Sequence, residues 1–124
     1  MNEPVKVLVL VADDNVGIRD TTAAILMAVG YTVTEAEDGE AALETLTQQS
    51  FDVVLLDVQM PRRNGISVVE AMIPEPPPPM IMMVSAYDFD ADLRERLGQK
   101  VFKYLKKPVP PKELIEAVHQ AALR

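Results

Sequence analysis

The 124-residue sequence contains no cysteine, which excludes disulfide bonds and thiolate chemistry. Its one histidine, His119, excludes a metal site built from several histidines. Long hydrophobic runs are also missing, because Val5–Ala12 is interrupted by Lys6 and is too short for a signal peptide or a membrane span. We therefore expect a cytoplasmic protein that makes no contact with membranes.

Positive charge is scarce, with 12 Lys and Arg against 19 Asp and Glu and a net charge of −7. This balance argues against direct binding to nucleic acids or anionic membranes, which requires a basic surface. The charge is uneven, because Arg94–Lys112 holds seven basic residues and one acid, a net +6 that leaves −13 for the rest. The basic segment predicts a partner patch rich in Asp and Glu. Alternatively, these cations only keep an edge strand soluble.

The length suits one domain, residues 1–124, and no internal repeat is visible. Short apolar runs alternate with segments of helical periodicity. The expected strands are Val5–Val11, Tyr31–Glu35, Phe51–Leu56, Met80–Val84 and Val101–Leu105. The expected helices cover Ile18–Val29, Glu40–Gln48, Gly65–Met72, Phe89–Leu97 and Leu114–Ala122. Because strand–helix–strand crossovers are right-handed, five such units predict an α/β fold with a doubly wound parallel sheet.

A proline-rich segment, Pro74–Pro79, separates the third helix from the fourth strand. Proline cannot continue a helix or a central strand, so we expect a stiff extended connector. A polyproline ligand for a partner protein is the alternative.

Polar residues follow the strands at the edge where doubly wound sheets bind their ligands. They are Asp13 and Asp14 after the first strand, Asp57 after the third, Ser85 and Ala86 after the fourth, and Lys106 and Lys107 after the fifth. Three carboxylates packed together repel one another unless a cation lies among them, and oxygen ligands with room for water suit Mg²⁺. A carboxylate nucleophile there would yield an aspartyl-phosphate, with a lysine and a hydroxyl neutralising the phosphoryl oxygens. Asp13 and Asp14 could instead cap the first helix.

The ordered set of motifs resembles response-regulator receiver domains over the whole chain. The motifs are Asp13-Asp14, Asp57 with Met60-Pro61 and Gly65, Ser85-Ala86, and Tyr104-Leu105-Lys106-Lys107-Pro108. The resemblance implies a flavodoxin-like sheet with strand order 2-1-3-4-5. Lys107, rather than Lys106, has the family's position directly before proline and three residues after the aromatic residue.

The resemblance also implies a role for each matched residue. Asp57 would be the phosphoacceptor and a Mg²⁺ ligand, Asp14 a direct ligand, Asp13 a ligand mostly through water, and the Gln59 backbone carbonyl a further ligand. Ser85, Ala86 and Lys107 would bind the phosphoryl group, and Gln59 and Tyr87 would tune dephosphorylation. Ser85 and Tyr104 would form the switch, in which movement of the Ser85 hydroxyl opens space for the Tyr104 ring to turn inward. Alternatively, Tyr104 is a half-buried core residue.

As a receiver, the chain would catalyse only its own phosphorylation and dephosphorylation. Its partners would be a sensor histidine kinase or histidine phosphotransfer protein, and an output partner or domain at the face of the fourth helix, fifth strand and fifth helix. A homodimer is compatible with the resemblance. Both a stand-alone regulator and a receiver cut from a longer protein stay open.

Two other functions use related chemistry or the same fold. A Mg²⁺ phosphohydrolase of the haloacid-dehalogenase type would carry a DxD pattern after the first strand and a cap insertion, whereas this strand ends Asp13-Asp14-Asn15. An interaction module that is never phosphorylated would be favoured by loss of a key residue, and each is present. A flavin or nucleotide binder would need a glycine-rich phosphate loop after the first strand.

Overall fold

The computed structural model describes residues 6–73 and 76–123. In these residues five parallel strands form one sheet in the order β2-β1-β3-β4-β5, as the family resemblance predicted. The strands are β1 (Leu8–Ala12), β2 (Thr32–Ala36), β3 (Val53–Asp57), β4 (Met80–Ser85) and β5 (Val101–Lys106). The helices are α1 (Val16–Ala28), α2 (Gly39–Gln48), α3 (Gly65–Ala71), α4 (Ala91–Leu97) and α5 (Pro111–Ala122), with a 3-10 turn, η1, at Gly98–Lys100.

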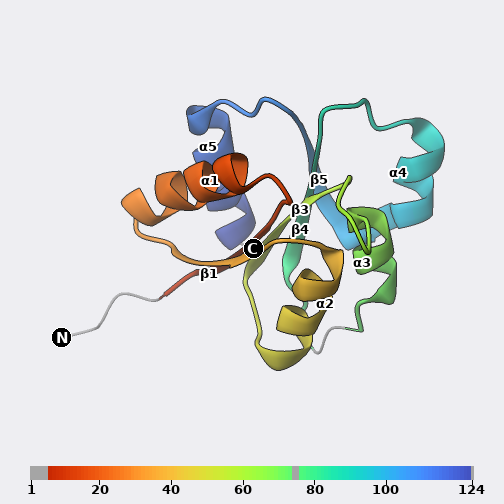
Figure 1. The fold of residues 1–124 in the computed structure, drawn as a ribbon, viewed down its shortest axis with the longest axis horizontal. Coiled ribbons are helices and arrows are strands. Elements are labelled where there is room, and N and C mark those ends of the chain that lie inside the picture. Colours follow the sequence, from red (N-terminus) through yellow and green to blue (C-terminus); the bar gives the residue numbers. More distant parts are fainter. Residues whose placement is uncertain (1–5, 74–75, 124) are drawn as a thin grey trace.

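Helices cover both faces of the sheet, with α1 and α5 on one side and α2, α3 and α4 on the other (Figure 1). Each side has its own apolar core, because alternate residues of a strand point to opposite faces. Val54 and Leu56 of β3 face α2 and α3, whereas Val53 and Leu55 face α1 and α5. All five residues of β3 are buried, so the apolar run correctly predicted a central strand covered on both faces.

The predicted elements are all present, and their bounds differ mainly at the ends. One assignment is wrong: Phe89 was predicted to begin the fourth helix, but α4 begins at Ala91 with Asp90 as its cap. Phe89 therefore lies in the preceding loop. β3 begins at Val53, and the carboxylate of the preceding Asp52 accepts a hydrogen bond from the Leu8 backbone N–H. Val5, Pro74 and Glu75, parts of a predicted strand and connector, lie outside the described residues.

The loop between β3 and α3 packs against the start of α2. Gly39 lies so close to it that a Cβ atom there would overlap the Arg63 carbonyl, which requires glycine. Arg63 Nε donates to Glu40 at 2.8 Å, and Arg62 Nε lies 3.5 Å from Asp38. These contacts fix the segment that follows Asp57.

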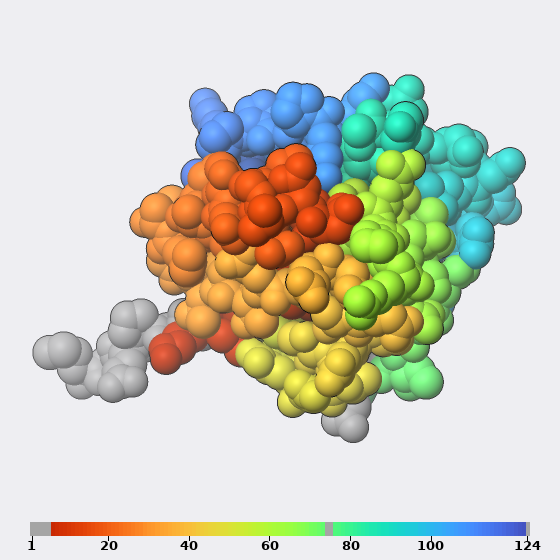
Figure 2. All heavy atoms as spheres, viewed as in Figure 1, coloured from red at the N-terminus to blue at the C-terminus, as the bar shows by residue number. Residues whose placement is uncertain are grey.

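No helix of the described residues combines the length and the apolar character needed to cross a membrane. The space-filling view shows the start of α1, in red-orange, directly beside the yellow-green segment that follows β3 (Figure 2). These two segments come from the ends of neighbouring strands, since β1 pairs with β3. The edge at which they meet carries the polar residues predicted from the sequence.

Candidate functional site

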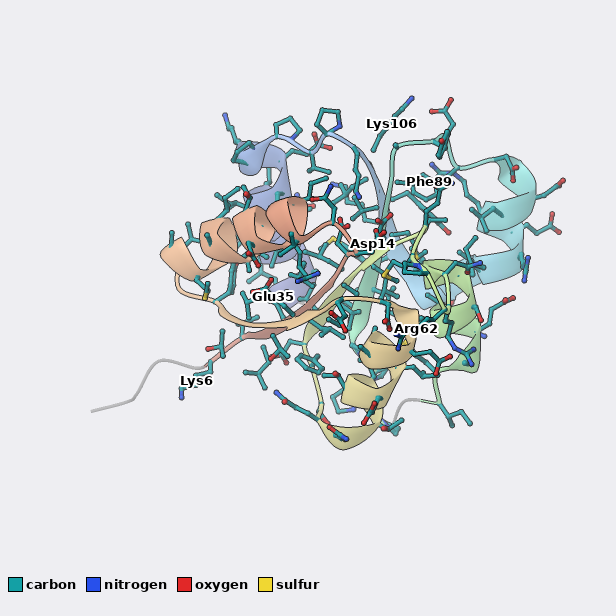
Figure 3. The ribbon with its side chains drawn as sticks, viewed as in Figure 1. Lys6, Asp14, Glu35, Arg62, Phe89 and Lys106 are labelled. Atoms are coloured by element: carbon teal, nitrogen blue, oxygen red, sulfur yellow. The ribbon has the colours of Figure 1, made fainter. Side chains whose placement is uncertain are left out.

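Three carboxylates lie together where β1 and β3 end. Oxygen atoms of Asp13, Asp14 and Asp57 all lie within 4.8 Å of one another. Asp13 and Asp57 are only 5% and 6% exposed, whereas Asp14 is open to solvent near the centre of the view in Figure 3. Two carboxylates are therefore set into the protein and a third lies at the mouth of the site.

Lys107 bridges the two buried carboxylates. Its Nζ donates to Asp13 Oδ2 at 2.9 Å and to Asp57 Oδ2 at 3.0 Å. Burial alone disfavours the charge on Lys107, but the hydrogen bonds to both carboxylates outweigh it and raise its pKa. Lys106 instead points outward and pairs with exposed Asp88 at 2.7 Å (Figure 3). The geometry therefore brings Lys107, and not Lys106, into the cluster.

Burial raises the pKa of the Asp57 carboxyl, and the neighbouring charge of Asp13 raises it further. Lys107 and the Gln59 N–H, which donates to Asp57 Oδ1 at 3.2 Å, act in the opposite direction. One ammonium group is thus shared between two buried carboxylates and leaves the cluster short of positive charge. An added cation bound by these oxygens would relieve the remaining repulsion.

The Asp13 carboxylate also accepts a hydrogen bond from the Asn15 backbone N–H at 2.9 Å. Asn15 itself caps α1, because its side chain accepts from the Ile18 N–H. The alternative in which Asp13 or Asp14 caps this helix is therefore wrong. Both carboxylates remain available to the cluster.

Ser85 ends β4 and is 4% exposed. Its hydroxyl accepts from the Tyr87 N–H at 3.1 Å, and its carbonyl accepts from the Lys107 N–H at 2.7 Å. Ala86 is exposed and lines, with Asp57 and Lys107, a cavity of about 880 Å³ between α1 and α5. Gln59 is exposed, as is Tyr87, so both lie on the outer rim.

Tyr104 is partly buried and packs against the core on the α4 side, and its hydroxyl is buried without a hydrogen-bond partner among the described residues. Burial raises the pKa of this hydroxyl. The Phe89 ring packs on the Tyr104 ring, with the two ring centroids 4.8 Å apart. The sequence led us to expect that the ring turns inward when the site is phosphorylated, but here the hydroxyl is already inside.

The basic segment Arg94–Lys112 is not a free strip of charge. Arg96 forms two hydrogen bonds with Glu70 of α3, Lys106 pairs with Asp88, and Lys107 lies in the site. The prediction of a basic partner patch counted these three cations as available. The acidic partners of these cations are distant in the sequence and approach them only in the folded chain.

Arg19 is a site residue that sequence reasoning missed. Its Nη1 donates to the Asp13 carbonyl at 2.9 Å, and its Nε donates to Glu35 of β2 at 3.1 Å. The available signal was a cation near the start of α1, where the helix dipole disfavours positive charge. Such a residue needs acceptors nearby, and the sequence could not show which ones.

Comparison with known proteins places this arrangement in one family. The family model for the response regulator receiver domain matches residues 9–119. The chain is 39% identical over 116 residues to a probable transcriptional regulator ycf27 of Guillardia theta, covering 94% of this chain and 45% of that protein. It spans about half the length of the curated relatives it matches.

Solved structures show the same fold. The receiver domain of the putative regulator NarL from Mycobacterium tuberculosis matches with a TM-score of 0.83 and 32% identity, covering 97% of this chain and 98% of that one. The regulator TrrA of Thermotoga maritima, in complex with Mg²⁺-BeF, matches with a TM-score of 0.79 and 28% identity, covering 93% and 98%.

Proposed function

The chain belongs to the response regulator receiver family, and we propose that it is a phosphoacceptor switch that takes its phosphoryl group on Asp57. The observation that carries this proposal is the buried Asp57 carboxylate, held 3.0 Å from Lys107 beside two further acids. We take residues 1–124 as one receiver domain.

The geometry supports separate roles for the site residues during phosphoryl transfer. One oxygen of the Asp57 carboxylate would attack the phosphorus, forming an acyl–phosphate bond. The bond from phosphorus to a histidine nitrogen of the donor would break, and its electron pair would stay with that nitrogen. Lys107, the Ser85 hydroxyl and the Ala86 N–H would then face the phosphoryl oxygens, where fixed donors stabilise the charge of the transferring group. In this way the chain would catalyse its own phosphorylation.

The three carboxylates fit a hard divalent cation, because Mg²⁺ binds carboxylate oxygens and keeps several waters. Asp14 and Asp57 would ligate it directly with the Gln59 carbonyl, and Asp13 mostly through water. When bound, Mg²⁺ would neutralise charge on the carboxylates and phosphoryl oxygens. The Mg²⁺-BeF complex of the similar TrrA supports this choice of metal.

We propose a sensor histidine kinase or histidine phosphotransfer protein as donor, reaching Asp57 from the open rim. The output partner or domain would meet α4, β5 and α5, where Lys100, Lys103 and Lys112 remain to attract acidic groups. Relatives of this chain are named as transcriptional regulators, which fits an output through a further domain rather than direct binding of nucleic acid by this one.

Mass spectrometry after incubation with acetyl phosphate and Mg²⁺ tests the acceptor. The wild type should gain one phosphoryl group at Asp57, and Asp57→Asn should gain none there. Asp52→Asn, which alters the aspartate directly before β3 at the end of the strand away from the cluster, is the matched control and should be labelled like the wild type. Labelling that maps to another residue would refute the assignment, and no labelling at all would favour an unphosphorylated interaction module.

A second experiment tests the metal. Labelling should stop in excess chelator and return with Mg²⁺. Asp14→Ala should weaken Mg²⁺ binding more than Asp13→Ala, because losing a direct ligand removes more than losing a water-mediated contact. Equal labelling rates with and without chelator would contradict the proposal.

A further inference from the structure

Arg19 connects three elements at the edge of the acidic cluster. It is the fourth residue of α1, and its side chain is 14% exposed. One guanidinium group donates to the Asp13 carbonyl after β1 and to the Glu35 carboxylate in β2. Glu35 lies beneath α1 in Figure 3 and is paired in register with Val11 of β1. Arg19 therefore ties α1, β2 and the end of β1 together.

The bonded carbonyl has a special position. It belongs to the peptide unit between Asp13 and Asp14, and such a unit is planar. The Asp13 N–H donates to the Ala36 carbonyl at 3.2 Å, which holds the start of this residue against β2. Arg19 holds the carbonyl at the other end of the same residue. The direction of the Asp13 carbonyl thus sets the orientation of the plane that carries the Asp14 Cα.

Charges around Arg19 hold it in place. Asp20 lies close enough to Glu35 to raise the pKa of that carboxyl, so two acids gather beside the guanidinium. These acids compensate a cation near the start of a helix, where the dipole disfavours it. The arrangement is a shared network rather than a single exposed ion pair.

We propose that Arg19 is the positioning residue for the metal-binding carboxylates, acting through the Asp13 carbonyl to orient Asp14. This inference rests on the proposed function, because it takes the acidic cluster as the Mg²⁺ site. Outer partners of metal ligands typically change metal affinity by about 10–100-fold when they are removed.

A positioning role and a simple effect of charge predict opposite changes in Mg²⁺ affinity when Arg19 is removed, so the measurement distinguishes them. By charge alone, removing a cation near the cluster should tighten Mg²⁺ binding. By positioning, Arg19→Met should weaken it by about tenfold, the lower end of the outer-partner range. Arg19→Lys should be intermediate, because one ammonium group keeps the charge but lacks the two-pronged geometry of guanidinium.

The experiment is calorimetric titration of Mg²⁺ into the wild type, Arg19→Met and Arg19→Lys, with thermal unfolding of each protein measured without metal. Arg96→Met is the matched control: it removes an arginine bonded to a glutamate on α3, away from the cluster, and should bind Mg²⁺ like the wild type. Should Arg19→Met not fold, Arg19→Lys decides, since it keeps the positive charge and changes only the hydrogen-bond geometry: weaker Mg²⁺ binding by Arg19→Lys supports positioning, and unchanged binding contradicts it.

The outcomes separate the two proposals. A wild type that binds no Mg²⁺ would refute the metal site itself. If the wild type binds but Arg19→Met binds equally well or more tightly, the positioning role is overturned. A melting temperature that falls in Arg19→Met with unchanged Mg²⁺ affinity would likewise show that Arg19 only holds α1 against β2.

Discussion

The guanidinium carbon of Arg94, on α4, lies 4.3 Å from the centroid of the Tyr104 ring on β5. Its Nε also donates to the Phe89 carbonyl at 3.2 Å. One side chain thus covers the aromatic ring that lies beside the site and fastens the loop that leads from Ser85 to α4. The Tyr104 ring is held between the core, the Phe89 ring and this cation.

Removing the Arg94 side chain should make the Tyr104 ring more accessible to solvent. Arg94→Ala should lower the free energy of unfolding by about 0.5–1 kcal/mol, the usual worth of a partly exposed cation–π contact. It should also make Tyr104 more accessible to a fluorescence quencher in a protein whose other two tyrosines are changed to phenylalanine. Arg96→Ala, on the same helix, should leave the quenching unchanged. Equal quenching with and without Arg94 would show that the core alone holds the ring.

The buried Tyr104 hydroxyl should cost stability, because it has no partner among the described residues. Tyr104→Phe should therefore raise the free energy of unfolding by about 1 kcal/mol, since a buried unsatisfied polar group costs about 1–3 kcal/mol. Urea unfolding measures this, with exposed Tyr87→Phe expected to change nothing. Destabilisation by Tyr104→Phe would mean that the hydroxyl is hydrogen-bonded in solution.

Arg62 has a φ of 68°, in the left-handed region that favours glycine. Arg62→Gly should be more stable than Arg62→Ala by about 1 kcal/mol, because alanine keeps the backbone strain and both variants lose the ion pair with Asp38. At ordinary backbone angles alanine is the more stable of the two. Thermal unfolding of the pair decides, and the ordinary order would show that this loop relaxes to a negative φ.

The pKa of Glu35 is raised first by the hydrogen bond that its protonated form can share with Asp20, then by partial burial and the charge of Asp20. A carboxyl whose pKa is raised on folding binds protons more tightly in the folded chain, so stability falls as pH rises from below 4.5 through the raised value. Asp20→Asn should lower the Glu35 pKa and flatten this part of the stability curve. An NMR titration of the Glu35 carboxyl measures it, and an unmoved pKa would contradict the assignment to Asp20.

The sequence by itself determined the parallel sheet and the strand ends that carry the acidic cluster, whereas the strand order and the choice of Lys107 came from the family resemblance. Apolar runs such as Val53–Leu56 must be buried on both faces, and periodic segments between them must be helices, so the strand ends that carry Asp13, Asp57 and Ser85 had to share one edge. These inferences need only local patterning and the handedness of crossovers. Asn15 as the cap of α1 was overlooked, although its residue type and place before the helix fit the role.

Only the tertiary structure decided how distant side chains meet. That Lys107 spans Asp13 and Asp57 while Lys106 turns to Asp88 depends on how β5 ends beside β4. The net +6 of the basic segment was correct as a count, yet Glu70 and Asp88 neutralise part of it from other elements. Ion pairs and ring contacts of this kind join residues far apart in the chain, and no periodicity records them, because their distances are set by the packing of whole helices on the sheet.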